Sequence, residues 1–170
     1  MDYVGLVLFA LPAYIANGAP VLFGGGRPVD GGAYFYDGRR LFGDSKTVRG
    51  LVSGVAAGMA AAVLLAYAVP ALFLPQFPFA TKMLVAFLLS AGTLCGDLLG
   101  SFLKRRMGLT PGEHFFITDQ VLFFAVALAF SSVVYLPSYD GVLYLFIVTF
   151  ALHILSNMAA HRLKLKNVPW

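Results

Sequence analysis

Long apolar stretches alternate with short polar breaks along the whole chain. A bilayer span needs about 20 mostly apolar residues, because lipid offers the peptide backbone no hydrogen-bonding partner outside its own helix. The breaks between the stretches are rich in glycine, proline or charge. The pattern therefore predicts an all-α polytopic membrane protein with five transmembrane helices. The spans that we expect are 3–23, 51–69, 83–103, 120–137 and 142–161.

The composition supports a membrane protein. Of the 170 residues, 59% are hydrophobic and only 12% are charged, and the mean hydropathy is +0.82, far from the usage of soluble domains. The single Cys95 excludes a disulfide framework and a cysteine-based metal site. The N-terminus has neither a positive leading region nor a small-residue cleavage site, so we expect a retained first helix. With no internal repeat or soluble segment visible, residues 1–170 are expected to form a single integral membrane domain.

The basic residues fall almost entirely on one side of the expected membrane. Eleven of the twelve Lys and Arg residues lie there, and Lys82 alone lies on the other side. Because Lys and Arg collect in cytoplasmic loops, the N-terminus is expected outside and the C-terminus in the cytoplasm. The expected cytoplasmic loops are 24–50 and 104–119, in a protein of the plasma membrane with its active site on the cytoplasmic side. The eleven are Arg27, Arg39, Arg40, Lys46, Arg49, Lys104, Arg105, Arg106, Arg162, Lys164 and Lys166.

The loop 24–50 contains charged residues that membrane topology does not require. It also contains Asp30, Asp37 and Asp44, and acidic residues contribute little to membrane orientation. A flexible linker is the alternative, but linkers rarely alternate Asp and Arg at this density. The loop therefore indicates chemistry.

The glycines of this loop do not match a known nucleotide-binding motif. After Gly38 and Gly43, two residues too many precede Lys46 for a P-loop. The run of glycines at 24–26 follows a predicted helix rather than a strand, which excludes a dinucleotide fingerprint. Glycine still lets backbone N–H groups approach a phosphate closely. We therefore predict a phosphate cradle whose charge comes from Arg39, Arg40, Lys46 and Arg49.

The third span contains an ionisable residue where lipid should be. From Met83 to Gly96 only 14 residues are free of charge, about 21 Å of helix against a hydrocarbon core of about 30 Å. The helix must continue through Asp97, and an acidic residue inside a span indicates a functional site. Asp97, Ser101 and Lys104 fall within about 60° on one helix face. The alternative is a structural Asp97–Lys104 pair, although two turns separate these residues by about 10 Å.

Asp119 lies at the membrane edge, close to the start of the fourth span. It is either a carboxylate favoured by the helix dipole or a partner of Asp97. Two carboxylates could share Mg²⁺, which completes its octahedron with phosphate oxygens and water, so this pair predicts a phosphorylated ligand. Asn17 has either a site role or a satisfied amide at a proline kink. His153 and Asn157 are expected to form interhelical hydrogen bonds.

Three separated blocks resemble the CDP-archaeol synthases, which are membrane cytidylyltransferases of archaeal lipid synthesis. The resemblance runs from about Asn17 to Gln120, and its second half is also similar to the wider CDP-diacylglycerol synthase signature. It implies Mg²⁺-dependent transfer of CMP from CTP to an ether-linked phosphatidic-acid analogue, giving CDP-archaeol and pyrophosphate. We expect the lipid bilayer as surroundings and no nucleic-acid partner, with the oligomeric state open. The blocks read NGAPVLFGGGRPVDGG, DGRRLFGDSKTVRG and GDLLGSFLKRR, followed by TDQ.

The resemblance also implies roles for individual residues. Asp97 and Asp119 would hold the metal, and Lys46 and Lys104 would act on phosphates at the reacting centre. One departure stands out: the family pattern has a second Asp three residues after Asp119, where this chain has Leu122. Either Asp97 and Asp119 suffice, or another carboxylate substitutes, or the activity is impaired. The candidate substitutes are Asp37, Asp44 and Glu113. The full set expected to contact CTP and lipid phosphates is Asn17, Arg39, Arg40, Asp44, Lys46, Arg49, Ser101, Lys104 and Arg105.

Two rival functions have different signatures. A CDP-alcohol phosphotransferase carries an Asp-Gly-x₂-Ala-Arg run, whose spacing DGRRLFGDSK does not match. A small transporter or assembly subunit without catalysis predicts charges lining a path through both leaflets. Here every ionisable candidate except Asp2, Lys82 and Asp140 lies at one cytoplasmic level.

Overall fold

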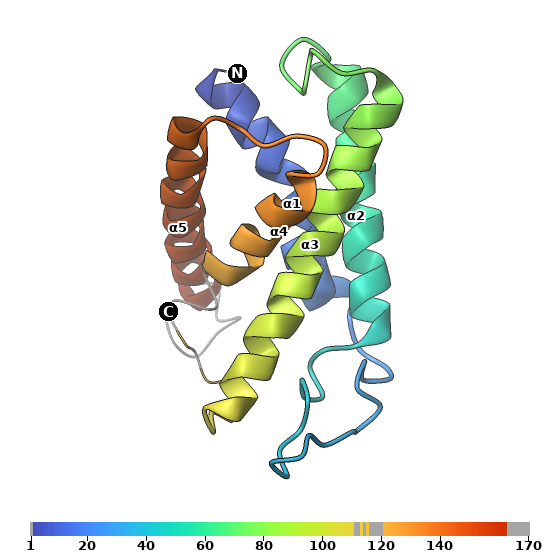
Figure 1. Ribbon diagram of the computed structural model, residues 1–170, viewed down its shortest axis with the longest axis vertical. Helices are drawn as coiled ribbons and strands as arrows, with labels where there is room; N and C mark the ends of the chain where they lie inside the picture. The colour runs from blue at the N-terminus through green and yellow to red at the C-terminus, as the bar shows by residue number, and fades with distance from the viewer. Residues whose placement is uncertain (1, 111–112, 114, 116–120, 163–170) are drawn as a thin grey trace.

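The computed structural model describes residues 2–110, 113, 115 and 121–162, and its regular elements there are α-helices. This confirms the all-α class. Figure 1 shows α1, α2 and α3 packed together, with the short α4 between α3 and the peripheral α5. Within the described residues, α1, α2 and α3 are long and apolar enough to cross a membrane, and 139–152 is a shorter apolar stretch. Five crossings therefore stay a prediction. The helices are α1 (Tyr3–Phe23), α2 (Val48–Ala68), α3 (Phe79–Arg106), α4 (Phe123–Ser131) and α5 (Tyr139–Arg162).

The second, third and fifth helices begin three or four residues earlier than expected, at Val48, Phe79 and Tyr139. The second helix begins at Val48, three residues early, because the Thr47 hydroxyl caps it by accepting a hydrogen bond from the Gly50 N–H. The third helix begins at Phe79 and runs without interruption through Asp97 to Arg106. The prediction that this helix continues through Asp97 is therefore confirmed.

The expected fourth span, 120–137, is wrong at its C-terminal end. Helix α4 stops at Ser131, and residues 132–137 form a turn and irregular chain. The hydroxyl groups of Ser131 and Ser132 donate to the carbonyls of Leu128 and Ala129, and such local bonds compete with helix continuation. Pro137 further disfavours helical backbone at the residue before it.

Glycines set the spacing between the helices. On α2, a Cβ at Gly54 or Gly58 would lie 2.8 Å from a carbonyl oxygen of α1. On α3, a Cβ at Gly92 or Gly96 would lie 2.8 Å and 2.6 Å from Cα atoms of α4. Each pair is spaced four residues apart, which puts one small surface on one helix face. The α1–α2 and α3–α4 contacts therefore depend on the absence of side chains.

The core lies between the helices and is closed at one end by the loop 69–78. Phe73 and Leu74 of this loop are fully buried, together with Phe9 of α1. Lys82 is also buried, and its Nζ donates to the Pro70 carbonyl at 3.3 Å. Lys82, the one basic residue at this end among the described residues, therefore holds a loop in place.

The two ends of the bundle differ in chemistry. The loop 24–47 and the C-terminal end of α3 lie at one end, and the loop 69–78 lies at the other (Figure 1). Helix α1 begins at the second end and α5 descends toward the first. The grouping of basic residues at one end agrees with the sequence, whereas the orientation of the termini in the membrane stays a prediction.

Alanine at Gly58 should destabilise the protein. The added Cβ would lie 2.2 Å from the Ser90 Oγ and 2.8 Å from the Pro12 carbonyl oxygen. We expect Gly58→Ala to lower the free energy of unfolding by about 1–3 kcal/mol, because α1 and α2 must separate. Denaturation in SDS-containing mixed micelles measures this change.

Gly18→Ala is the matched control. A Cβ at Gly18 would have no atom within 4 Å, so the better helix propensity of alanine should leave stability unchanged or raise it by up to about 1 kcal/mol. Equal unfolding midpoints for the two variants would contradict the packing role of Gly58.

Candidate functional site

The loop 24–47 is a folded substructure. Its two ends are tied by hydrogen bonds from the Val29 N–H to the Lys46 carbonyl at 2.8 Å and from the Val48 N–H to the Arg27 carbonyl at 3.1 Å. A second tie near its middle joins the Phe35 N–H to the Arg39 carbonyl at 2.8 Å. The flexible-linker alternative therefore does not hold for this loop.

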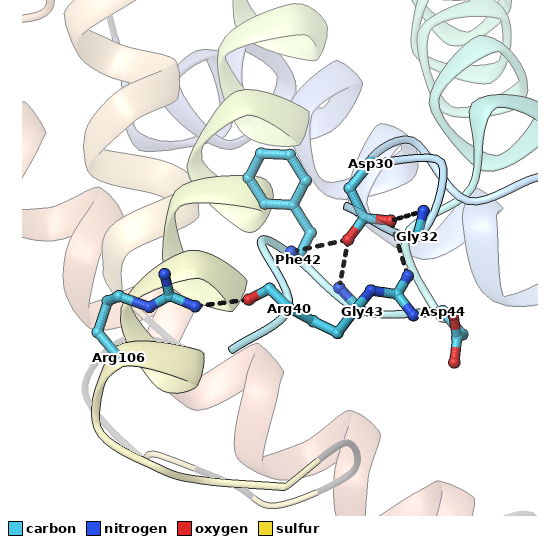
Figure 2. Close-up of polar contacts among 7 residues, drawn as sticks. All are labelled: Asp30, Gly32, Arg40, Phe42, Gly43, Asp44 and Arg106. Carbon is cyan, nitrogen blue, oxygen red and sulfur yellow. Dashed lines mark hydrogen bonds and ion pairs between the residues drawn. The ribbon is translucent and has the colours of Figure 1, made fainter. Parts of the chain in front are cut away.

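A buried carboxylate organises the loop. The side chain of Asp30 is 0% exposed and accepts hydrogen bonds from Arg40 and from the N–H groups of Gly32, Phe42 and Gly43 (Figure 2). Burial by itself would raise the pKa of Asp30. The bonds from Arg40 and three backbone N–H groups outweigh burial and hold the pKa well below its ordinary value of 3.8. Asp30 therefore stays ionised inside the loop.

The loop docks on the C-terminal end of α3. Nη1 of Arg39 donates to the carbonyls of Arg106 at 2.6 Å and Arg105 at 3.2 Å, which lack partners within the helix. In return, Nη2 of Arg106 donates to the Arg40 carbonyl at 2.6 Å (Figure 2). The guanidinium of Arg106 also lies over the rings of Phe35 and Phe102 at 4.9 Å and 4.8 Å.

This docking gives Arg39 a structural contact that the sequence did not predict. One of its nitrogens caps a helix, while its expected contact with substrate phosphates stays a prediction. The reasoning from sequence gave Arg106 no site role. A signal was present, because basic residues in the last turn of a helix complement its dipole.

An ion pair joins the loop to the third span. Nζ of Lys46 donates to Oδ2 of Asp97 at 2.5 Å, with side chains 23% and 34% exposed. Asp97 is therefore paired with a lysine 51 positions earlier in the chain, in the loop. The alternative considered from the sequence was Lys104, on the same helix. The Ser101 hydroxyl, expected to face a ligand, donates to the Asp97 backbone carbonyl at 2.9 Å.

A basic cavity of about 330 Å³ lies between the loop and the end of α3. Arg105 in its wall is 8% exposed and donates through Nη2 to the Thr110 carbonyl at 3.0 Å. Its buried Nε has no hydrogen-bond partner in the described part of the chain. The excess of guanidinium groups suits an anion. The lining residues are Arg39, Arg40, Gly43, Asp44, Arg105, Gly108, Leu109 and Thr110.

The remaining expected residues are placed as follows. Lys104 is half-buried in the last turn of α3, Asn17 is half-buried in α1, and Arg49 is exposed in the first turn of α2. Over the described ranges, Asn17 and Arg49 make no side-chain hydrogen bond or ion pair with the groups above. Asp119 lies outside the described residues, and so do the side chains of His153 and Asn157.

The candidate substitute ligands are engaged elsewhere. Oδ2 of Asp37 lies 3.1 Å from Nε of Arg106, and Oδ1 of Asp44 lies 2.8 Å from Nη1 of Arg40. The Glu113 carboxylate accepts a hydrogen bond from the Thr110 N–H at 2.6 Å. In the described ranges no three His, Cys, Asp or Glu side chains converge as a metal site would require.

Position 122 lies beside the turn of α3 that carries Asp97. A Cβ at Gly96 would be 3.0 Å from the Leu122 carbonyl oxygen. The position where the family pattern has its second Asp is therefore close to α3, and here it carries an apolar side chain. The described donor set is one partly exposed carboxylate, Asp97. This fits Mg²⁺, which commonly takes one or two protein carboxylates and completes its shell with phosphate and water.

Comparison with known proteins agrees with this site. The chain matches the family model described as "CarS-like: CDP-archaeol synthase" over residues 3–170. It is 45% identical over 162 residues to the CDP-archaeol synthase of Thermococcus onnurineus (strain NA1), covering 95% of this chain and 94% of the relative. It is 44% identical to that of Pyrococcus furiosus, covering 95% of each chain.

A solved structure has the same fold. It is described as "Structural insight into an intramembrane enzyme for archaeal membrane lipids biosynthesis", and it superposes with a TM-score of 0.79 at 39% sequence identity, covering 89% of this chain and 91% of that one. The helical architecture, the membrane setting and the sequence blocks thus agree with the resemblance. The chain belongs to the CDP-archaeol synthase family of membrane cytidylyltransferases.

Proposed function

We propose that this protein transfers CMP from CTP to an ether-linked phosphatidic-acid analogue, with Mg²⁺, giving CDP-archaeol and pyrophosphate. The observation that carries the proposal is the Lys46–Asp97 ion pair, which joins a carboxylate of α3 to the same loop that supplies Arg40 and Gly43 to the basic cavity. The membership of the family supplies the reaction class.

The chemistry needs little from the protein beyond positioning and charge. An oxygen of the lipid phosphate attacks the α-phosphorus of CTP, and the bond from that phosphorus to the β-phosphate oxygen breaks as pyrophosphate leaves. The attacking oxygen is already anionic at neutral pH, so no general base is required. In such transfers, alignment and neutralisation of phosphate charge provide most of the rate enhancement.

Four basic residues would neutralise the charge of the phosphates. The guanidinium groups of Arg40 and Arg105 line the cavity and would neutralise the phosphates of the nucleotide. Lys46, at the edge of the span, would meet the phosphates that approach Asp97. Lys104 in the last turn of α3 adds positive charge at the same end of the bundle. The lipid would enter sideways between the helices, with its tails remaining in the bilayer.

Asp97 and Asp119 would hold the metal. When bound there, Mg²⁺ would offset negative charge on the phosphates of CTP. The assignment of Asp119 rests on the sequence. With Leu122 in place of a third carboxylate, the protein contributes fewer charged ligands, and phosphate oxygens complete the shell.

Removing the carboxylate of Asp97 should abolish turnover. Purified protein in detergent, given labelled CTP, Mg²⁺ and a diether glycerol phosphate, should form labelled CDP-lipid. We expect Asp97→Asn to lower the rate by about 100-fold or more, because the amide cannot replace a metal-binding carboxylate. EDTA should stop the wild-type reaction.

Asp140→Asn is the control for this assay. Asp140 is an exposed carboxylate in the first turn of α5, at the other end of the bundle, so its variant should keep wild-type activity within about twofold. Full activity of Asp97→Asn, or activity unaffected by EDTA, would disprove the proposed site.

Cysteine labelling should test the orientation in the plasma membrane. Tyr36 in the loop 24–47 and Tyr139 at the start of α5 are 92% and 82% exposed at opposite ends of the bundle. In a Cys95→Ser background, an impermeant maleimide added to intact cells should label Tyr139→Cys. It should label Tyr36→Cys only after permeabilisation. The reverse pattern would place the active site outside the cell.

A further inference from the structure

Arg40 is held between two carboxylates that differ in their surroundings. Its Nη2 lies 2.8 Å from Oδ1 of Asp30, and its Nη1 lies 2.8 Å from Oδ1 of Asp44 (Figure 2). The Asp30 side chain is 0% exposed, whereas that of Asp44 is 78% exposed. Arg40 itself is 21% exposed and lines the basic cavity. One partner is therefore fixed inside the loop and the other stands in solvent.

Asp30 has no capacity left for a ligand. Oδ1 accepts from the Gly32 N–H at 3.0 Å and from Arg40, while Oδ2 accepts from the N–H groups of Phe42 and Gly43, each at 3.1 Å. An ionised carboxylate offers about four acceptor positions, and all of them are filled. Asp30 is therefore neither a metal ligand nor a base, and its effect on the site must pass through the groups that it holds.

The groups bound by Asp30 connect it to the basic cavity and to Lys46 of the Lys46–Asp97 ion pair. Gly43 lines the cavity at a φ of 104°, which residues other than glycine rarely adopt. The carbonyl of Gly43 accepts a hydrogen bond from the Lys46 N–H at 3.2 Å. Val29, next to Asp30, donates to the Lys46 carbonyl at 2.8 Å. Asp30 thus fixes Arg40 directly and Lys46 through the backbone.

Asp44 can leave Arg40 at little cost. An exposed ion pair contributes little to stability, because water and salt screen it. A phosphate entering the cavity can therefore replace Asp44 on Nη1 while Asp30 keeps Nη2 in place. The guanidinium of Arg105 lines the same cavity and supplies a second positive charge.

We propose that Asp30 is a positioning residue that presents Arg40 to a phosphate group of the nucleotide, and that Asp44 is the exchangeable partner which the phosphate displaces. The inference rests on the proposed function for the identity of the nucleotide. The phosphate chemistry itself follows from the charges of the cavity.

Two substitutions with the same change in charge should have opposite effects. Asp30→Asn and Asp44→Asn each remove one negative charge beside Arg40. If charge alone governed anion binding, both would strengthen it. If Asp30 positions Arg40, then Asp30→Asn weakens anion binding. The amide nitrogen of the new asparagine would face hydrogen-bond donors, so the Arg40 guanidinium would no longer be held in place.

The experiment titrates pyrophosphate into the full-length protein in detergent, with EDTA present and at low ionic strength, by isothermal calorimetry. We expect Asp30→Asn to bind about tenfold more weakly than wild type or worse, the effect of losing one charge-assisted contact. Asp44→Asn should bind equally well or up to about fivefold more tightly. Asp30→Glu, which keeps the charge but moves the carboxylate by one methylene, should also bind more weakly.

Equal strengthening by Asp30→Asn and Asp44→Asn would overturn the proposal, and so would wild-type affinity in Asp30→Glu. Absence of pyrophosphate binding by the wild type would overturn it as well. Pyrophosphate binding in EDTA requires no turnover and therefore tests the role of Asp30 alone. The CDP-lipid assay tests the proposed function separately.

Kinetics separate positioning from a loss of folded protein. In the CDP-lipid assay, Asp30→Asn should raise the KM for CTP at least about fivefold with a smaller change in kcat. A purely structural defect would lower the active fraction and leave KM unchanged, which would contradict the proposal. If Asp30→Asn does not fold, Arg40→Gln should show the same loss of pyrophosphate affinity, and wild-type affinity in that variant would equally overturn it.

Discussion

The carbonyl groups at the C-terminal end of α3 provide the anchor on which the site depends. A helix end leaves its last carbonyls without partners inside the helix, and here Arg39 reaches from the loop 24–47 to bind two of them. Arg106 of α3 in turn donates a hydrogen bond to the Arg40 carbonyl of the loop. Because these bonds run in both directions, the loop is fixed against the span that carries Asp97. Without this docking, the basic residues of the loop would have no defined position relative to the membrane.

Fixing the loop allows charged groups to be placed at the edge of the lipid. Asp97 lies within a membrane helix, where an unpaired carboxylate is costly, and Lys46 offsets that cost from the loop. The pair is only partly covered, so phosphates and a metal ion can reach it. Asp30 performs the equivalent task inside the loop, where its saturated carboxylate holds Arg40 at the cavity. The site is thus an arrangement of charges supported by buried hydrogen bonds.

Close helix packing brings the fourth helix to the same place. Gly96 lets the start of α4 approach the turn of α3 that carries Asp97, so that the backbone of Leu122 lies against this turn. The difference at Leu122 therefore falls next to the turn that carries Asp97. Asp119, which the resemblance assigns to the metal, lies outside the described residues. Small residues in the spans thereby determine which part of α4 lies against the turn that carries Asp97.

Features that depend on local pattern could be predicted from the sequence. Hydrophobic runs defined the helices, the shortage of apolar residues before Asp97 showed that the third helix carries a charge, and the motif blocks indicated the family. The early end of α4 was missed, because the serine hydrogen bonds and Pro137 outweighed a continuous apolar run. Three contacts became apparent from the folded structure alone: Lys46 pairs with Asp97, Arg39 caps α3, and the Asp30 carboxylate has all its acceptor positions filled. These contacts join residues up to 67 positions apart, and no local periodicity specifies which distant groups the folding of the loop will bring together.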